Sequence, residues 1–383
     1  MRTCGVANPA AGAIGRRGES RSLTRQTYGR PVVCAIRPAY TSVPGQRTLW
    51  LSSGWNPRRP IFVVQAMTRK FGNDGADAPH PYDCAVIGAG PAGLTAALYL
   101  ARFRRSVIVF DGGPSRAQWI PESQNCPGFP GGISGNRLLE RLRAQLAGYA
   151  ARICAKRVEA LRRYAGSFLL TDSDGDEVAA RTVLLATGIV DALPDADWVE
   201  AAIGVGALRL CPVCDGFEAS DQRIAVYGPG ESALNHAEFL RTYSADVALV
   251  CSDGRPLDDA QSRRAASLGV RVVPQSGDLR FDGQRCSFGM ADGTPEAFDS
   301  VYVFLGCQAQ SALAQAMGAE SDEDGALRVG RDQMTTVEGL YAAGDVVSAL
   351  HQISVAVGHS GVAATAIHKA LDSNPRLPAE ARR

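Results

Sequence analysis

Two cysteines separated by two residues are the most reactive feature of this 383-residue chain. They lie in the run Leu210 to Gly216, as Cys211 and Cys214, with Asp215 directly after them. Two thiols at this spacing can close a small disulfide ring, and a helix that begins at them favours the thiolate of one. The spacing therefore favours thiol–disulfide exchange.

Two other interpretations of the pair are open. It could be half of a zinc site, but the remaining cysteines and the five histidines are scattered singly, so no second closely spaced pair completes four ligands. It could also be structural, as two small buried residues. We expect redox exchange and no metal.

Asp215 is a candidate proton carrier because it follows Cys214 directly. A carboxyl group in a partly dehydrated site has a raised pKa and can deliver a proton during dithiol chemistry. The alternative is a helix cap, in which the carboxylate accepts hydrogen bonds from the backbone amides that follow. We expect the proton-carrying role.

A glycine-rich turn stands upstream of the cysteines, between a strand expected over residues 82–87 and a helix over 94–100. Gly88 permits the tight bend, Gly90 leaves room for a pyrophosphate, and Gly93 lets the helix pack close to the strand. The turn consists of Gly88, Ala89, Gly90, Pro91, Ala92 and Gly93. The next strand ends at Asp111, which we expect to bind a ribose.

A second turn of the same design follows the cysteines, after a strand over 223–227. Its residues are Gly228, Gly230 and Ala233, and a helix over 234–240 comes next. The following strand leads to Asp253, where a ribose-binding acid belongs, with Arg255 nearby. A 2′-phosphate would be repelled by Asp253, so the sequence favours NADH over NADPH.

A third landmark lies near the end of the chain, where Gly344 and Asp345 follow a short apolar stretch and precede a helix expected over 355–371. Asp345 can meet a ribityl hydroxyl or a phosphate-bridging water, while the helix points its amino terminus at a flavin ring. Leu184 to Gly188 reads as a strand with a tight turn.

Composition and charge exclude several classes of protein. The net charge is +1, yet residues 1–70 hold about a dozen arginines and lysines against the single acid Glu19, so the rest is acidic. We therefore expect no nucleic-acid binding. No apolar run reaches the length of a membrane span. Singly scattered cysteines favour a reducing, cytoplasmic setting.

Residues 1–79 read as a basic leader without periodicity. It could be a transit peptide to an organelle, a disordered tail, or upstream sequence before a true start at Met67. We favour the start at Met67.

With these landmarks in order, residues 80–371 resemble the low-molecular-weight thioredoxin reductases, which are FAD-dependent pyridine nucleotide-disulfide oxidoreductases. The resemblance also rests on Asn125 to Phe129 and on Ala186 to Gly188. It implies that Cys214 faces the flavin, that Cys211 attacks the partner's disulfide, that Asp215 is the acid and that Asn125 lies beside the flavin. It further implies a homodimer and a nicotinamide domain that rotates during turnover.

Two segments depart from the family pattern. Cys251 to Asp253 stand where NADPH-binding members carry a His-Arg-Arg run, so a phosphate clamp is missing. Leu350 to Gln352 stand in place of a Tyr-Arg-Gln run, and we expect only Gln352 to keep its contact with the flavin ring.

The expected fold is α/β, with two Rossmann-like domains, the second inserted into the first. Residues 80–193 and 308–375 would bind FAD, and residues 194–307 would bind the nicotinamide nucleotide and carry the cysteines. The expected function is a flavin-dependent disulfide reductase that passes electrons from NAD(P)H through FAD to a thioredoxin-like protein or a small disulfide. The alternatives are an FAD-dependent oxidase of small dithiols and a redox sensor without catalysis.

Overall fold

A computed structural model describes residues 81–376, apart from 291–292, 348–349 and the side chains of 275–277. All of the described residues belong to one contact-defined unit of the chain. The expected leader and the expected start at Met67 lie outside the described residues.

The first sheet has seven strands in the order β3-β2-β1-β6-β5-β4, and β17 pairs with the carboxyl-terminal half of β6. Strands β1, β2, β3, β6 and β17 are parallel, whereas β4 and β5 are antiparallel additions beside β6. The strands are β1 (Tyr82–Ile87), β2 (Val107–Phe110), β3 (Ala151–Cys154), β4 (Val158–Tyr164), β5 (Ser167–Asp172), β6 (Glu177–Leu185) and β17 (Leu340–Ala342).

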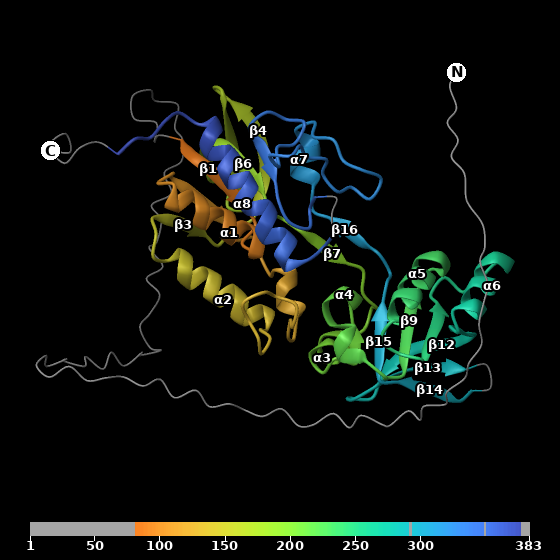
Figure 1. The fold of residues 1–383 in the computed structure, drawn as a ribbon. Coiled ribbons are helices and arrows are strands. Elements are labelled where there is room, and N and C mark those ends of the chain that lie inside the picture. Colours follow the sequence, from red (N-terminus) through yellow and green to blue (C-terminus); the bar gives the residue numbers. More distant parts are fainter. Residues whose placement is uncertain (1–80, 291–292, 348–349, 377–383) are drawn as a thin grey trace, which may run out of the picture. The chain divides into compact units, whose positions relative to one another are not determined.

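Helices α1 (Pro91–Arg102) and α8 (Ile353–Ala370) lie side by side (Figure 1). Helix α1 begins three residues before the expected start because proline suits the first helical position, where no amide proton is needed. The hydroxyl of Ser360 donates to the carbonyl of Ala92, which ties the two helices together. The other elements here are η1 (Arg116–Trp119), α2 (Gly135–Leu146) and α7 (Ala312–Ala316).

The second sheet has five parallel strands in the order β11-β10-β9-β15-β8. They are β8 (Leu208–Arg209), β9 (Ile224–Gly228), β10 (Val247–Cys251), β11 (Arg271–Val273) and β15 (Ser300–Val303). The associated helices are α3 (Val199–Gly204), α4 (Pro212–Asp215), η2 (Phe217–Ala219), α5 (Gly230–Leu240) and α6 (Asp259–Ser267). A three-stranded antiparallel sheet consists of β12 (Gln275–Phe281), β13 (Cys286–Met290) and β14 (Pro295–Phe298).

All strands of the second sheet occur in sequence between β6 and β17 of the first sheet. The chain runs between the sheets through β7 (Ile189–Asp191) and β16 (Cys307–Ala309), which pair antiparallel. The predicted α/β class, with a second parallel sheet inserted into the first, is therefore confirmed. The expected domain limits at 193/194 and 307/308 lie beside this two-stranded connection and stay a prediction.

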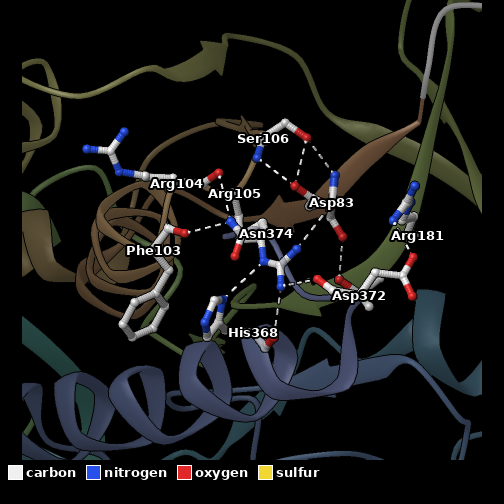
Figure 2. Close-up of polar contacts among 10 residues, drawn as sticks. Asp83, Phe103, Arg104, Arg105, Ser106, Arg181, His368, Asp372 and Asn374 are labelled. Atoms are coloured by element: carbon white, nitrogen blue, oxygen red, sulfur yellow. Dashed lines mark hydrogen bonds and ion pairs between the residues drawn. The ribbon is translucent and has the colours of Figure 1, made fainter. Parts of the chain in front are cut away.

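A buried arginine ties the end of α1 to the carboxyl end of α8. Arg105, with 3% of its side chain exposed, follows α1 and donates to the carbonyls of His368 and Asp372 at 3.0 and 2.8 Å. Its Nε donates to Nδ1 of His368 at 3.1 Å, and the carboxylate of Asp83 lies 3.8 Å away. Figure 2 shows these groups converging from β1, α8 and the segment after it. The amide of Asn374 adds a bond to the carbonyl of Phe103.

We expect Arg105→Ala to lower the free energy of unfolding by about 3 kcal/mol, because Asp83 and the backbone carbonyls of His368 and Asp372 lose a buried partner. Urea denaturation followed by circular dichroism measures this change. Arg104→Ala removes the same charge from an exposed neighbour and should change stability by less than about 0.5 kcal/mol. Equal effects of the two substitutions would contradict this account of the cluster.

Candidate active site

Cys211 and Cys214 form a disulfide, with their Cα atoms 5.3 Å apart. The four-residue helix α4 starts directly after Cys211, and the amide of Cys214 donates to the carbonyl of Cys211 at 3.0 Å. This tight turn brings the two sulfurs together. The predicted pair is thus in its oxidised form.

Cys214 lines a cavity of about 550 Å³, so the disulfide borders this space. The walls come from the glycine-rich turn after β1, the segment after β2, the loop near Asn125, the start of β4, the end of β6 and the segment before α8. Among the predicted site residues, the lining includes Gly88, Ala89, Gly90, Pro91, Ala92, Asn125, Gly344, Asp345 and Gln352. One sulfur of the pair therefore faces the same space as the first glycine-rich turn.

Close backbone contacts explain the glycines of this turn. A Cβ atom at position 93 would lie 1.8 Å from the carbonyl oxygen of Gly88, and Gly88 itself has a φ of +109°. Gly90 caps α1 without any side-chain hydrogen bond to the first helical amides. Those amides and the helix dipole are therefore available to an anionic group such as a pyrophosphate.

Asn125 and Gln352 connect the cavity wall to the disulfide. Nε2 of Gln352 lies 3.3 Å from both sulfurs, and its Oε1 accepts from the amide of Asn125 at 3.0 Å. The same amide donates to the carbonyl of Val213 at 3.1 Å, and Ser123 donates to Oδ1 of Asn125. These bonds orient both amides and hold the redox turn at the cavity.

Asp215 is the last residue of α4, and the cap of the next helix, η2, is Gly216, without a side-chain hydrogen bond to its first amides. Asp215 therefore does not act as a helix cap. Its carboxylate accepts a hydrogen bond from Tyr302 at 2.9 Å and pairs with Arg209 at 3.0 Å. Burial raises the pKa of Asp215, while Arg209 and Tyr302 act in the opposite direction. A carboxyl group with a raised pKa on the residue directly after Cys214 suits proton transfer.

Asp345 lies at the cavity beside Arg116, with its carboxylate 3.9 Å from the guanidinium. Arg116 also makes two hydrogen bonds to Asp191 of β7, at 2.6 and 2.9 Å. Burial raises the pKa of Asp345, and the nearby His351 and Arg116 oppose this shift. One arginine thus joins the cavity wall to the connection between the two sheets.

Asp111 pairs with Arg143 of α2 at 3.0 Å and is not among the lining residues of the cavity. Its ribose-binding role stays a prediction.

The second glycine-rich turn joins β9 to α5. A Cβ atom on Gly228 would lie 2.5 Å from the carbonyl oxygen of Phe304, and Ala233 is fully buried. The amide of Ser252 donates to the carbonyl of Gly228 at 3.0 Å, so the loop that carries Asp253 starts beside the turn. Asp253 is exposed and accepts from the amide of Arg255 at 3.2 Å. Its position suits the predicted contact with a ribose.

Within the described residues, no three His, Cys, Asp or Glu side chains gather in a way that could hold a metal ion. In the same part of the chain, no helix combines the length and apolarity that a membrane crossing requires.

Comparison with known proteins decides the family. The sequence model of the pyridine nucleotide-disulphide oxidoreductases matches residues 82–360. The chain belongs to this family. The oxidoreductase is similar to the thioredoxin reductase of Mycolicibacterium smegmatis, with 31% identity over 298 residues that cover 74% of this chain and 94% of the relative. It is 29% identical to the thioredoxin reductase of Streptomyces coelicolor, over 77% of this chain and 93% of the relative.

Solved structures agree with this assignment. The crystal structure of HlmI is 32% identical, with a TM-score of 0.71 over 77% of this chain and 94% of that one. The thioredoxin reductase from Streptococcus pyogenes is 25% identical, with a TM-score of 0.70 over 76% of this chain and 98% of that one. The expected family resemblance and the expected enzyme class are thereby confirmed.

Membership of the oxidoreductase family implies FAD and a nicotinamide nucleotide, and the cavity fits FAD. Gly90 and Ser115 both line it, and a Cβ on Gly90 would lie 3.1 Å from Oγ of Ser115, so a side chain at position 90 would crowd this wall. The first amides of α1 have no side-chain cap and can therefore bind a phosphate. When bound, FAD passes electrons between NAD(P)H and a disulfide. In this chain the α1 turn and Asp345 would hold it, with Cys214 as the nearby acceptor.

The sequence did not single out Arg209, Tyr302 or Arg116. Arg209 lies two residues before Cys211, but sequence spacing does not reveal that its side chain turns back to Asp215. Tyr302 looked like one apolar position of a buried strand, and it is fully buried. A buried tyrosine needs a hydrogen-bond partner, and this was the available signal.

We expect Gly93→Ala to lower the affinity of the oxidoreductase for FAD at least about tenfold, because the new methyl group pushes α1 away from the turn at Gly88. The flavin absorbance that remains after dialysis of the purified protein reports this loss. Gly204→Ala is the matched control, since its Cβ meets no atom within 4 Å. Full flavin content in Gly93→Ala would mean that the turn does not bind FAD.

Proposed function

We propose that this oxidoreductase is an NADH-preferring, FAD-dependent reductase of a thioredoxin-like disulfide. The observation that carries the proposal is the Cys211–Cys214 disulfide held by Gln352 at the glycine-walled cavity. The named thioredoxin reductases among the relatives support a thioredoxin-like partner. Electrons would enter the disulfide at Cys214 and leave through Cys211.

The assignment of the two cysteines rests on their different surroundings. Cys214 lines the cavity, whereas Cys211 does not. In the reduced protein, the thiolate of Cys211 would attack the partner's disulfide and form a mixed disulfide, while the partner's other sulfur leaves as a thiolate. Cys214 would then attack Cys211, releasing the reduced partner and restoring the internal disulfide.

Exposed apolar groups near the redox turn suit a protein substrate. Phe217 is 75% exposed and Val213 is 43% exposed, although both lie within three residues of a redox cysteine. Exposed apolar side chains beside a reactive group favour contact with another protein surface.

The preference for NADH rests on Asp253. Its exposed carboxylate stands in the loop beside the second glycine-rich turn, where it can accept hydrogen bonds from a ribose diol. A 2′-phosphate in the same place would meet this negative charge, and Arg255 is the nearest arginine in sequence.

We also propose a homodimer in a reducing compartment such as the cytoplasm. Tyr99 is 42% exposed and Val357 is 38% exposed on the neighbouring helices α1 and α8, and an apolar face of this kind suits a second copy. Cys84, Cys126, Cys154, Cys251, Cys286 and Cys307 are free thiols, which suits such a compartment.

Anaerobic titration of the purified flavoprotein, with NADH and separately with NADPH, tests the reductase direction. We expect stoichiometric bleaching of the flavin absorbance by NADH and weaker binding of NADPH, because of Asp253. A lower dissociation constant for NADPH would refute the preference for NADH. If a small dithiol bleaches the flavin and neither nucleotide does, the enzyme is a dithiol oxidase.

Two serine substitutions test the roles of the cysteines. Cys214→Ser leaves the attacking thiol of Cys211 without its resolving partner, so we expect a stable mixed disulfide with a thioredoxin-like protein on a non-reducing gel. Cys211→Ser is the matched control and should form little of this adduct. The reverse pattern would exchange the two roles.

A further inference from the structure

The carboxylate of Asp215 is held by two side chains from neighbouring strands of the second sheet. Oδ2 pairs with Nη1 of Arg209 on β8 at 3.0 Å, and Oδ1 accepts from the hydroxyl of Tyr302 on β15 at 2.9 Å. Nη1 of Arg209 also donates to the backbone carbonyl of Asp215 at 3.3 Å. Both carboxylate oxygens therefore have a partner on the side of the sheet.

Arg209 is itself fixed in position. Its Nε donates to the carbonyl of Gly206 at 3.1 Å and lies 3.0 Å from the hydroxyl of Ser300. Ser300 is fully buried and bonds to Gln222 at 2.6 Å. With 14% of its side chain exposed, Arg209 has little freedom to move away from Asp215.

The charges around Asp215 act in opposite directions. Burial and the carboxylate of Glu218 on η2 favour the neutral acid, whereas Arg209 and Tyr302 favour the carboxylate. Burial also raises the pKa of Tyr302, so its hydroxyl stays a hydrogen-bond donor. The side chain of Asp215 remains 26% exposed, which leaves a route for protons from water.

We propose that Arg209 and Tyr302 are positioning residues. They hold the side chain of Asp215 and stabilise its carboxylate form after Asp215 has delivered its proton to the cysteine pair. This inference rests on the proposed role of Asp215 as the acid. Reduction of the Cys211–Cys214 bond by two electrons yields two thiolates, and one of them becomes a thiol by taking the proton of Asp215. Arg209 and Tyr302 stabilise the remaining carboxylate until water returns a proton.

A purely structural role is the competing explanation, since the same contacts fasten α4 to β8 and β15. The two explanations differ in their response to charge. If the contacts are only structural, losing them destabilises the protein without changing the pKa of Asp215. If they stabilise the carboxylate, losing them raises the pH at which Asp215 ionises.

The test is a pH titration of the oxidised holoenzyme by infrared difference spectroscopy, with Asp215→Asn as the reference that identifies the Asp215 carboxyl bands. We expect Arg209→Gln to raise the pKa of Asp215 by about one to three units, because an adjacent positive charge is lost. Arg209→Lys keeps the positive charge, so the pKa of Asp215 should stay near its wild-type value. Tyr302→Phe removes one hydrogen bond to the carboxylate and should raise the pKa by less.

The matched control is Ser300→Ala, which disturbs the contacts of Arg209 but leaves the charge beside Asp215 unchanged. We expect it to keep the pKa of Asp215 at the wild-type value. If Arg209→Gln fails to fold, Tyr302→Phe, which removes a hydrogen bond to the carboxylate, and Ser300→Ala, which changes only the packing around Arg209, still test the inference. An unchanged pKa in Tyr302→Phe and Arg209→Gln, or an equal shift in Ser300→Ala, would overturn the inference.

A second measurement separates this inference from the proposed function. The pH dependence of disulfide reduction in a single turnover should move with the pKa of Asp215 in each variant. If Asp215→Asn reduces the disulfide at the wild-type rate, the proposed acid role fails. If Asp215→Asn is slow while Arg209→Gln keeps the wild-type pH dependence, only the roles of Arg209 and Tyr302 fail.

Discussion

Electrons can enter a protein disulfide from a bound flavin only if a sulfur atom lies at the wall of the flavin cavity. Cys214 meets this requirement, and the amide of Gln352 contacts both sulfurs. Asn125 adds a bond to the backbone of the redox turn. The groups come from three distant segments of the chain, so the site exists only when these segments are folded together.

The cavity itself depends on the close approach of backbones at one turn. Helix α1 packs so near to β1 that only a glycine fits at position 93, and the first amides of α1 remain uncapped. Because the parallel strands β1, β2 and β6 end at the same edge of the sheet, the loops after them converge on this helix end. The chain repeats this design at β9 and α5, where Gly228 meets the carbonyl of Phe304.

In the proposed reaction, electrons and protons reach the cysteine pair from different sides. Cys214 lines the cavity beside the first sheet, whereas the carboxylate of Asp215 contacts Arg209 of β8 and Tyr302 of β15 in the second sheet. A proton carrier outside the flavin cavity can exchange with water without opening that cavity. The side chain of Asp215 is 26% exposed, which leaves this carboxyl group in contact with water.

The sequence by itself determined the fold class, the two glycine-rich turns, the redox cysteines and the family. Each of these depends on short-range patterns, such as Pro91 at a helix start or two cysteines within one helical turn. Only the tertiary structure decided which side chains surround those groups. The pairing of Arg209 with Asp215, the burial of Tyr302 and the bond from Gln352 to the sulfurs join residues that the sequence separates by 6 to 141 positions. Side-chain direction and burial depend on how the sheets pack, and no local pattern encodes them.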